Sequence, residues 1–278
     1  MKRYFKKDQQ IHFDFSQAPA LIKRKGKNAL ETIAFGRDDT SRWAKAQNSF
    51  LRWTSDQRAF TEQYIERGKK TYGTFFEKRG PLRGKIIDIG GGWGLYRQWW
   101  EPGESDIFIV HDPGVQRFLH GPHRLHQYYY QKAFSLPMTF VEGFGEDLPY
   151  ESNIFDTCLI AVTLDHCINP QKVCSEAYHV LRPGGSILVI QSCNSPTLDS
   201  YHRHILKRLL QYLRHPKSIL VTLSNLLFYP DRHLHHFSTM DIISLLEQSG
   251  FSKINVNIVP TTKNVYGFEA IKEHPDIS

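Results

Sequence analysis

The chain has 278 residues, of which 40% are hydrophobic and 23% are charged, and its formal net charge is +7. This composition is typical of a globular protein with room for one large domain or two small ones. No apolar run reaches the length of about 18 residues that a membrane helix needs, and no signal-peptide core follows the basic first residues. The four cysteines form no Cys-x-x-Cys pair, so we expect reduced thiols in a cytoplasmic protein.

Residues 1–80 lack the strand rhythm of the rest of the chain. Between Trp43 and Lys78, apolar residues recur at helical intervals among many charged side chains, which predicts helices. Residues 1–40 show little periodicity, and we expect them to be partly disordered or to wrap around the surface. We therefore interpret residues 1–80 as an N-terminal extension of the domain that follows.

From residue 85 onward, strand patterns alternate with helix patterns, which predicts a parallel sheet with crossover helices. The predicted strands cover residues 86–87, 107–110, 139–141, 157–162 and 187–191. A helix over 171–181 is stopped by Pro183-Gly184-Gly185, and a helix over 240–248 begins at the capping-box pair Ser238 and Asp241. Two further strands are predicted over 253–259 and 265–271.

The stretch 85–94 is the most informative motif of the chain. Its strand ends in the acid Asp88 and runs at once into a glycine-rich turn that contains Gly90, Gly92 and Gly94. Without a Cβ, glycine lets the backbone turn sharply and approach a ligand closely. The spacing differs from the dinucleotide fingerprint Gly-x-Gly-x-x-Gly, because Leu95 stands at the last position.

A second acid, Asp112, ends the second predicted strand. At the carboxyl edge of a parallel sheet, an acid in this position can accept hydrogen bonds from both ribose hydroxyls of an adenosine. The alternative is an ordinary turn aspartate in front of Pro113-Gly114.

Three more blocks follow in order. Residues 142–150 are Glu-Gly-Phe-Gly-Glu-Asp-Leu-Pro-Tyr, residues 161–170 are Ala-Val-Thr-Leu-Asp-His-Cys-Ile-Asn-Pro, and residues 176–185 are Glu-Ala-Tyr-His-Val-Leu-Arg-Pro-Gly-Gly. Together with the glycine turn and Asp112, these blocks resemble the motifs of class I S-adenosylmethionine-dependent methyltransferases, a group that includes quinone- and sterol-biosynthesis enzymes. The resemblance covers about residues 84–194 and 236–272.

The resemblance implies an α/β fold with a Rossmann-like seven-stranded sheet of order 3-2-1-4-5-7-6, in which the last strand is antiparallel. The methyltransferase domain would cover residues 81–278, with a helical lid at 196–235. The implied cofactor is S-adenosylmethionine, and the implied cofactor-binding residues are Asp88, Gly90, Gly92, Gly94, Asp112, Gly145 and Glu146. Phe144 stands where the family usually has Asp, so the adenine contact must come from Glu146, Asp147 or a carbonyl, or from stacking on Phe144.

His166 is the first candidate catalytic residue at the end of the fourth strand, and Asp165 is the second. An acceptor hydroxyl would need a general base, and a histidine titrates near neutral pH. The alternative is a structural histidine. No metal site is expected, and the cluster His233-Leu-His-His236 is interpreted as capping, packing or lining the acceptor pocket.

The predicted lid carries a leucine stripe flanked by basic residues, so it packs on its own domain or makes peripheral contact with an anionic membrane. Its apolar roof favours a hydrophobic or lipid-like acceptor. The predicted function is therefore methyl transfer to such a small molecule. One alternative is an RNA methyltransferase, which only the net charge favours. The other is a cofactor-binding partner protein without catalysis, which only Phe144 favours.

Overall fold

The computed structural model describes residues 3–7, 10–12, 43–44, 61–113, 124–193, 233–260, 262 and 264–274. The helices of these ranges are α3 (Glu62–Arg79), η1 (Leu95–Trp99), α5 (Arg124–Tyr129), α6 (Gln131–Ser135), η2 (Leu164–His166), α7 (Pro170–Val180) and α10 (Thr239–Gln248). The strands are β1 (Arg3–Lys7), β2 (Gln10–His12), β3 (Ile86–Ile89), β4 (Phe108–Asp112), β5 (Thr139–Glu142), β6 (Phe155–Ala161), β7 (Leu181–Ser192), β8 (Ser252–Ile258) and β9 (Val265–Ile271).

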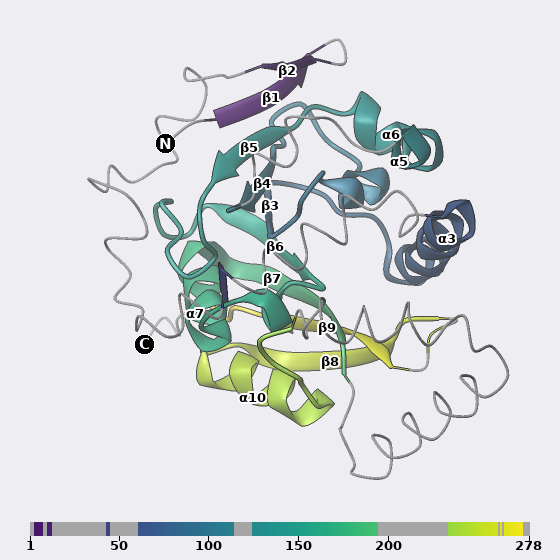
Figure 1. The fold of residues 1–278 in the computed structure, drawn as a ribbon. Helices are drawn as coiled ribbons and strands as arrows, with labels where there is room; N and C mark the ends of the chain where they lie inside the picture. Colours follow the sequence, from purple (N-terminus) through teal and green to yellow (C-terminus); the bar gives the residue numbers. More distant parts are fainter. Residues whose placement is uncertain are drawn as a thin grey trace, which may run out of the picture.

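The described strands form one sheet in the order β2-β1-β5-β4-β3-β6-β7-β9-β8 (Figure 1). Neighbours from β5 to β7 are parallel, whereas β9 runs antiparallel to both β7 and β8. The seven strands from β5 to β8 therefore confirm the predicted order and the antiparallel last strand. Their parallel part places the carboxyl ends of β3, β4, β5 and β6 along one edge.

Two strands that the sequence did not predict extend the sheet. β1 pairs antiparallel with β5, with Tyr4 opposite Phe140, and β2 pairs with β1 (Figure 1). They lie in the segment for which we expected disorder or a surface wrap. Strands this short hold too few residues for an alternating pattern to stand out, and their pairing partner lies far away in the sequence.

The sheet buries both of its faces. On one face, Ile87 and Ile89 of β3 join a core with α7 and α10, and on the other face Ile86 joins a core with α3 and Trp100. Figure 1 shows α7 and α10 on one side of the sheet and α3, α5 and α6 on the other. Because side chains alternate along a strand, Asp88 lies on the same face as Ile86.

Helix ends follow the local sequence closely. Ser238 and Asp241 form the predicted capping box of α10. After the glycine turn the chain forms only the short 3₁₀ helix η1. The reason is local, because the side chain of Arg97 in η1 donates to the carbonyls of Trp93 and Gly94.

The predicted lid at 196–235 lies outside the described residues except for its end at 233–235. Among the helices of the described ranges, none has both the length and the apolarity needed to cross a membrane. The four cysteines are buried and free.

Candidate functional site

The glycine turn folds back against its neighbouring strand ends. The amide of Gly90 donates to the carbonyl of His111 over 2.7 Å, and the amide of Gly94 donates to the carbonyl of Gly91 over 2.8 Å. Gly90 has a φ of 68°, and a Cβ there would overlap Thr163. A Cβ on Gly91 would overlap the carboxylate of Asp88. The turn thus needs glycine because it passes tightly over both neighbours.

Asp88 is a buried acid under this turn. Its side chain is 0% exposed, and neither carboxylate oxygen accepts a hydrogen bond from the residues that the structure describes. Burial and the nearby Asp112 together raise its pKa to about 8, although the charge of Arg97 acts in the opposite direction. Asp88 is therefore a carboxyl group whose ionisation depends on a positive charge at this position.

Arg97 stabilises the glycine turn, a role that the sequence alone did not indicate. It is fully buried, and its guanidinium donates to the carbonyls of Gly94 at 3.0 Å and Leu136 at 2.7 Å. Burial lowers its pKa to about 9, so it stays cationic at neutral pH. This buried cation ties the glycine turn to the loop before β5.

Asp112 lies at the carboxyl end of β4, beside the turn. Its Oδ2 accepts a hydrogen bond from the amide of Gly92 at 3.2 Å. The side chain is largely buried, yet it lines the pocket described next. The predicted ribose-binding acid therefore lies at the pocket wall and is oriented by the glycine turn.

A pocket of about 630 Å³, including its open mouth, lies at this edge of the sheet. Of the predicted residues, Gly90, Asp112, Gly145, Glu146 and His166 line it. Asp88, Gly92, Gly94 and Asp165 are not among its lining residues.

An aromatic pair forms one wall of the pocket. The rings of Trp43 and Phe144 have centroids 4.9 Å apart and are tilted by 60°. Trp43, which the sequence analysis assigned to a helix of the extension, thus contributes to the site. A further wall residue, Val162, has a φ of 53°, a conformation that costs a β-branched residue about 1–3 kcal/mol.

The loop that carries Phe144 is fixed by a buried histidine. Nε2 of His111 lies 3.2 Å from the carbonyl of Phe144 and therefore donates to it, while Nδ1 accepts from the hydroxyl of Tyr150 at 3.1 Å. Burial lowers the pKa of His111 to about 4, so the ring is neutral. A Cβ on Gly143 would overlap this ring.

Glu146 has a partner inside the protein. Its Oε1 accepts from the amides of Ile168 at 2.8 Å and Asn169 at 3.2 Å. The carboxylate thereby holds the start of α7 against the pocket wall that Glu146 lines. Gly145 allows this wall to approach β3, because a Cβ there would overlap Ile89.

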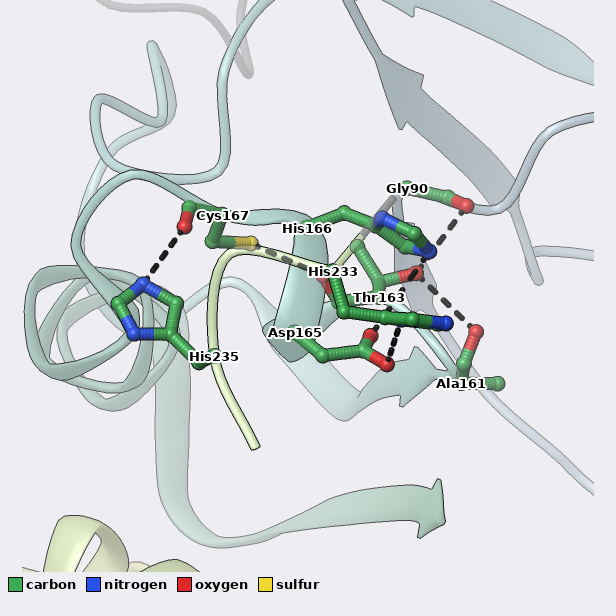
Figure 2. A network of polar contacts seen from close by, with 8 residues as sticks. All are labelled: Gly90, Ala161, Thr163, Asp165, His166, Cys167, His233 and His235. Carbon is green, nitrogen blue, oxygen red and sulfur yellow. Dashed lines mark hydrogen bonds and ion pairs between the residues drawn. The ribbon is translucent and has the colours of Figure 1, made fainter. Parts of the chain in front are cut away.

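Asp165 and His166 belong to η2, and His233 comes from the segment before α10 (Figure 2). Nδ1 of His233 lies 2.7 Å from Oδ2 of Asp165, and Nε2 of His166 lies 3.9 Å from Oδ1. The two imidazole rings stack with centroids 4.8 Å apart. Burial by itself would raise the pKa of Asp165, but the approach of His233 and the charge of His166 outweigh it and lower that pKa.

The turn around η2 is tied to the glycine turn and to the C-terminal segment (Figure 2). The hydroxyl of Thr163 donates to the carbonyls of Ala161 at 3.0 Å and Gly90 at 3.4 Å. The amide of Leu234 donates to the carbonyl of Asp165 at 2.7 Å, and Nε2 of His235 donates to the carbonyl of Cys167 at 3.0 Å. His235 thus has a structural role, in line with the expected packing of the 233–236 cluster.

A protein-family model described as "Methyltransferase domain" matches residues 87–189. The ubiquinone/menaquinone biosynthesis C-methyltransferase UbiE of Rhizobium etli is 32% identical over 122 residues, which are 42% of this chain and 46% of that protein. The 2-methyl-6-phytyl-1,4-hydroquinone methyltransferase 1 of Oryza sativa is 31% identical over 106 residues, 38% of this chain and 30% of that protein. The chain thus spans less than half the length of these curated relatives.

Solved structures agree on the fold. A putative methyltransferase of Haloferax volcanii, in complex with the Trm112 activator, superposes with a TM-score of 0.52 at 12% identity, over 81% of this chain and 98% of that chain. The [4+2]-cyclase SpnF superposes with a TM-score of 0.50 at 12% identity, over 74% of this chain and 82% of that chain. At such identities the likeness shows the fold alone, and a cyclase among the neighbours illustrates that one fold hosts different reactions.

Proposed function

We propose that this chain, in which residues 87–189 form a class I methyltransferase domain, transfers a methyl group from S-adenosylmethionine to a small hydrophobic or lipid-like acceptor. The observation that carries the proposal is the pocket at the carboxyl edge of the sheet, where the glycine turn and Asp112 meet the aromatic wall of Trp43 and Phe144.

The residues present fit this cofactor by their chemistry. Asp88 is a buried carboxyl group whose oxygens accept no hydrogen bond from the described residues, and it suits the positive charge of an amino-acid ammonium group. Asp112 offers a carboxylate to ribose hydroxyls. Trp43 and Phe144 offer an aromatic surface for an adenine ring, which replaces the acid that the family usually has at position 144.

When bound, S-adenosylmethionine supplies an activated sulfonium methyl group. The chain's own residues then have to hold, orient and shield the reactants. We assign the ribose to Asp112 and the adenine side to Phe144, Gly145 and Glu146, in a loop that neutral His111 keeps in place. The apolar walls of the pocket exclude water from the reacting groups.

His166 is the residue that we assign to the acceptor. It lines the pocket at the end of β6, and the buried carboxylate of Asp165 lies beside it. The imidazole of His166, when it carries no charge, can take up the proton of an acceptor hydroxyl. One curated relative is named for ubiquinone/menaquinone biosynthesis and another for methylation of a phytyl hydroquinone, and these names support a lipid-like acceptor for this chain.

Calorimetric titration with S-adenosylmethionine and S-adenosylhomocysteine tests the proposal. We expect micromolar binding to the wild type and a loss of about 1–3 kcal/mol, roughly tenfold to a hundredfold in affinity, in Asp112→Ala. The exposed acid Glu104 provides the matched control, and Glu104→Ala should bind as the wild type does.

A methyl-transfer assay with polyprenylated quinols completes the test. Turnover of a quinol supports the proposed acceptor class. Cofactor binding without turnover of any lipid-like acceptor would favour a catalytically inactive partner protein. Methylation of RNA instead would identify the chain as an RNA methyltransferase.

A further inference from the structure

Three metal-ligand side chains meet next to the pocket, although they come from two distant parts of the sequence. Asp165, His166 and His233 each offer one ligand atom, and these atoms lie within 4.8 Å of one another. Figure 2 shows the two imidazole rings face to face beside the carboxylate. From the sequence we expected no metal here, because the 233–236 cluster lies just before a helix cap and is interpreted as capping, packing or lining the acceptor pocket.

The carboxylate at the centre of this group is buried and incompletely paired. The side chain of Asp165 is 7% exposed, and within the described residues no donor lies in full hydrogen-bond geometry to its Oδ1, although the side chain of Gln191 lies near enough to help lower the pKa of Asp165. A buried carboxylate oxygen without a hydrogen bond of full geometry is destabilising. A cation at Oδ1 would remove that destabilisation.

The separation of Oδ1 from its neighbour fits an ion better than a direct bond. Oδ1 of Asp165 and Nε2 of His166 lie 3.9 Å apart, beyond hydrogen-bond distance. Two ligand atoms that share one zinc-like ion, each at about 2.0–2.2 Å, lie roughly 3–4 Å from each other. To admit the same ion, the 2.7 Å between Nδ1 of His233 and Oδ2 of Asp165 would have to lengthen to roughly 3–4 Å, and any pair of ligand atoms near the 4.8 Å limit would have to close to the same range.

The backbone holds these ligands together without help from an ion. The amide of Leu234 donates to the carbonyl of Asp165, and His235 donates to the carbonyl of Cys167. His233 is therefore kept beside η2 by the hydrogen bonds of Leu234 and His235, the two residues that follow it. Such preorganisation is what a metal site needs from its surroundings.

We propose that Asp165, His166 and His233 bind one divalent transition-metal ion of the zinc or iron class. Two histidines and one carboxylate leave coordination positions open. Since His166 lines the pocket, those positions can hold an acceptor oxygen, and this role of the ion rests on the proposed methyl transfer. In that case His166 acts as a ligand, and the ion, rather than the imidazole, makes the acceptor hydroxyl more acidic.

Metal titration of the tag-free, chelator-treated full chain tests the site. Zn²⁺ is titrated by calorimetry and Co²⁺ by its visible absorption. We expect one ion per chain and at least a tenfold loss of affinity in Asp165→Asn, His166→Gln and His233→Gln. The matched control is His236→Gln, an exposed histidine whose ring centroid lies 6.1 Å from that of His233, and it should bind as the wild type does.

Absence of uptake by the wild type, or equal uptake by the wild type and all four variants, would overturn the proposal. Circular dichroism shows whether Asp165→Asn keeps the fold, and the more exposed His233 gives an independent variant if it does not. Titration of S-adenosylhomocysteine into the same proteins separates the two proposals, because a missing metal leaves cofactor binding intact.

Discussion

Three ionisable side chains, Asp88, Arg97 and His111, lie fully buried around the glycine turn. Arg97 and His111 have partners inside the protein, since the guanidinium donates to backbone carbonyls and the imidazole bonds Phe144 and Tyr150. Asp88 differs, because its oxygens accept no hydrogen bond from the described residues. Arg97 therefore stabilises the glycine turn and His111 the loop of Phe144, whereas Asp88 is left to respond to a ligand.

Cofactor binding should release a proton from Asp88. With a pKa of about 8, this carboxyl group is largely protonated in the free protein at pH 7. A cationic ligand lowers that pKa, so binding expels up to one proton and tightens as the pH rises toward 8. Calorimetry in buffers of different ionisation enthalpy measures the number of protons released. Asp88→Asn should release none, and a buffer-independent heat in the wild type would contradict the assignment.

His111 should make the protein sensitive to acid. Its folded-state pKa of about 4 lies below the unfolded value of about 6.5, so protonation favours the unfolded chain. Its contribution to stability is present above pH 6.5 and is lost as the pH falls toward 4, by roughly 3 kcal/mol. Urea unfolding of the wild type and His111→Gln over this range tests it. The variant should be less stable at pH 7 but should show the shallower pH dependence.

At the scale of elements, the positions of the seven strands could be predicted because each is a short apolar run that ends in a turn signal, whereas their order followed only from the resemblance to the methyltransferase family. Asp88 and Asp112 could be predicted because both follow such runs directly. Sequence patterns could not predict the roles of Trp43, Arg97 and His111. These roles depend on contacts that form only on folding, such as the hydrogen bond of His111 to the loop of Phe144. The same holds for His233, which meets Asp165 only through the loop before α10.

Substitution by alanine should change the free energy of unfolding in opposite directions at two glycines, one in α3 and one in the glycine turn. Gly68 lies within α3, where a Cβ would meet only the hydroxyl of Tyr130 at 3.8 Å. Gly68→Ala should raise the free energy of unfolding by about 0.5–1 kcal/mol, because glycine loses more entropy in a helix. Gly91→Ala should lower it and weaken cofactor binding, since its Cβ would overlap Asp88. Denaturant titration of both variants measures the two signs, and stabilisation by Gly91→Ala would contradict the packing of the turn.

At the scale of the whole molecule, the pocket joins parts of the chain that lie far apart in the sequence. Trp43 comes from the N-terminal extension, Asp112 from β4, Phe144 from the loop after β5, and His166 from η2. A ligand in this pocket contacts all of them at once and binds only the folded arrangement. Its binding free energy is then added to the stability of the domain.

S-adenosylhomocysteine should therefore raise the melting temperature of the full chain. At a ligand concentration of about 100 times Kd, the added stability is about 2.7 kcal/mol. For a domain of this size that corresponds to a shift of roughly 4–8 °C. Differential scanning calorimetry measures this shift, and NADH is the comparison ligand. NADH should not raise the melting temperature, because the spacing of Gly90, Gly92 and Leu95 argues against a dinucleotide site. If NADH raised the melting temperature and S-adenosylhomocysteine did not, the turn would serve a different nucleotide. If the increase with S-adenosylhomocysteine disappeared in Asp112→Ala, the stabilisation would be tied to the ribose contact.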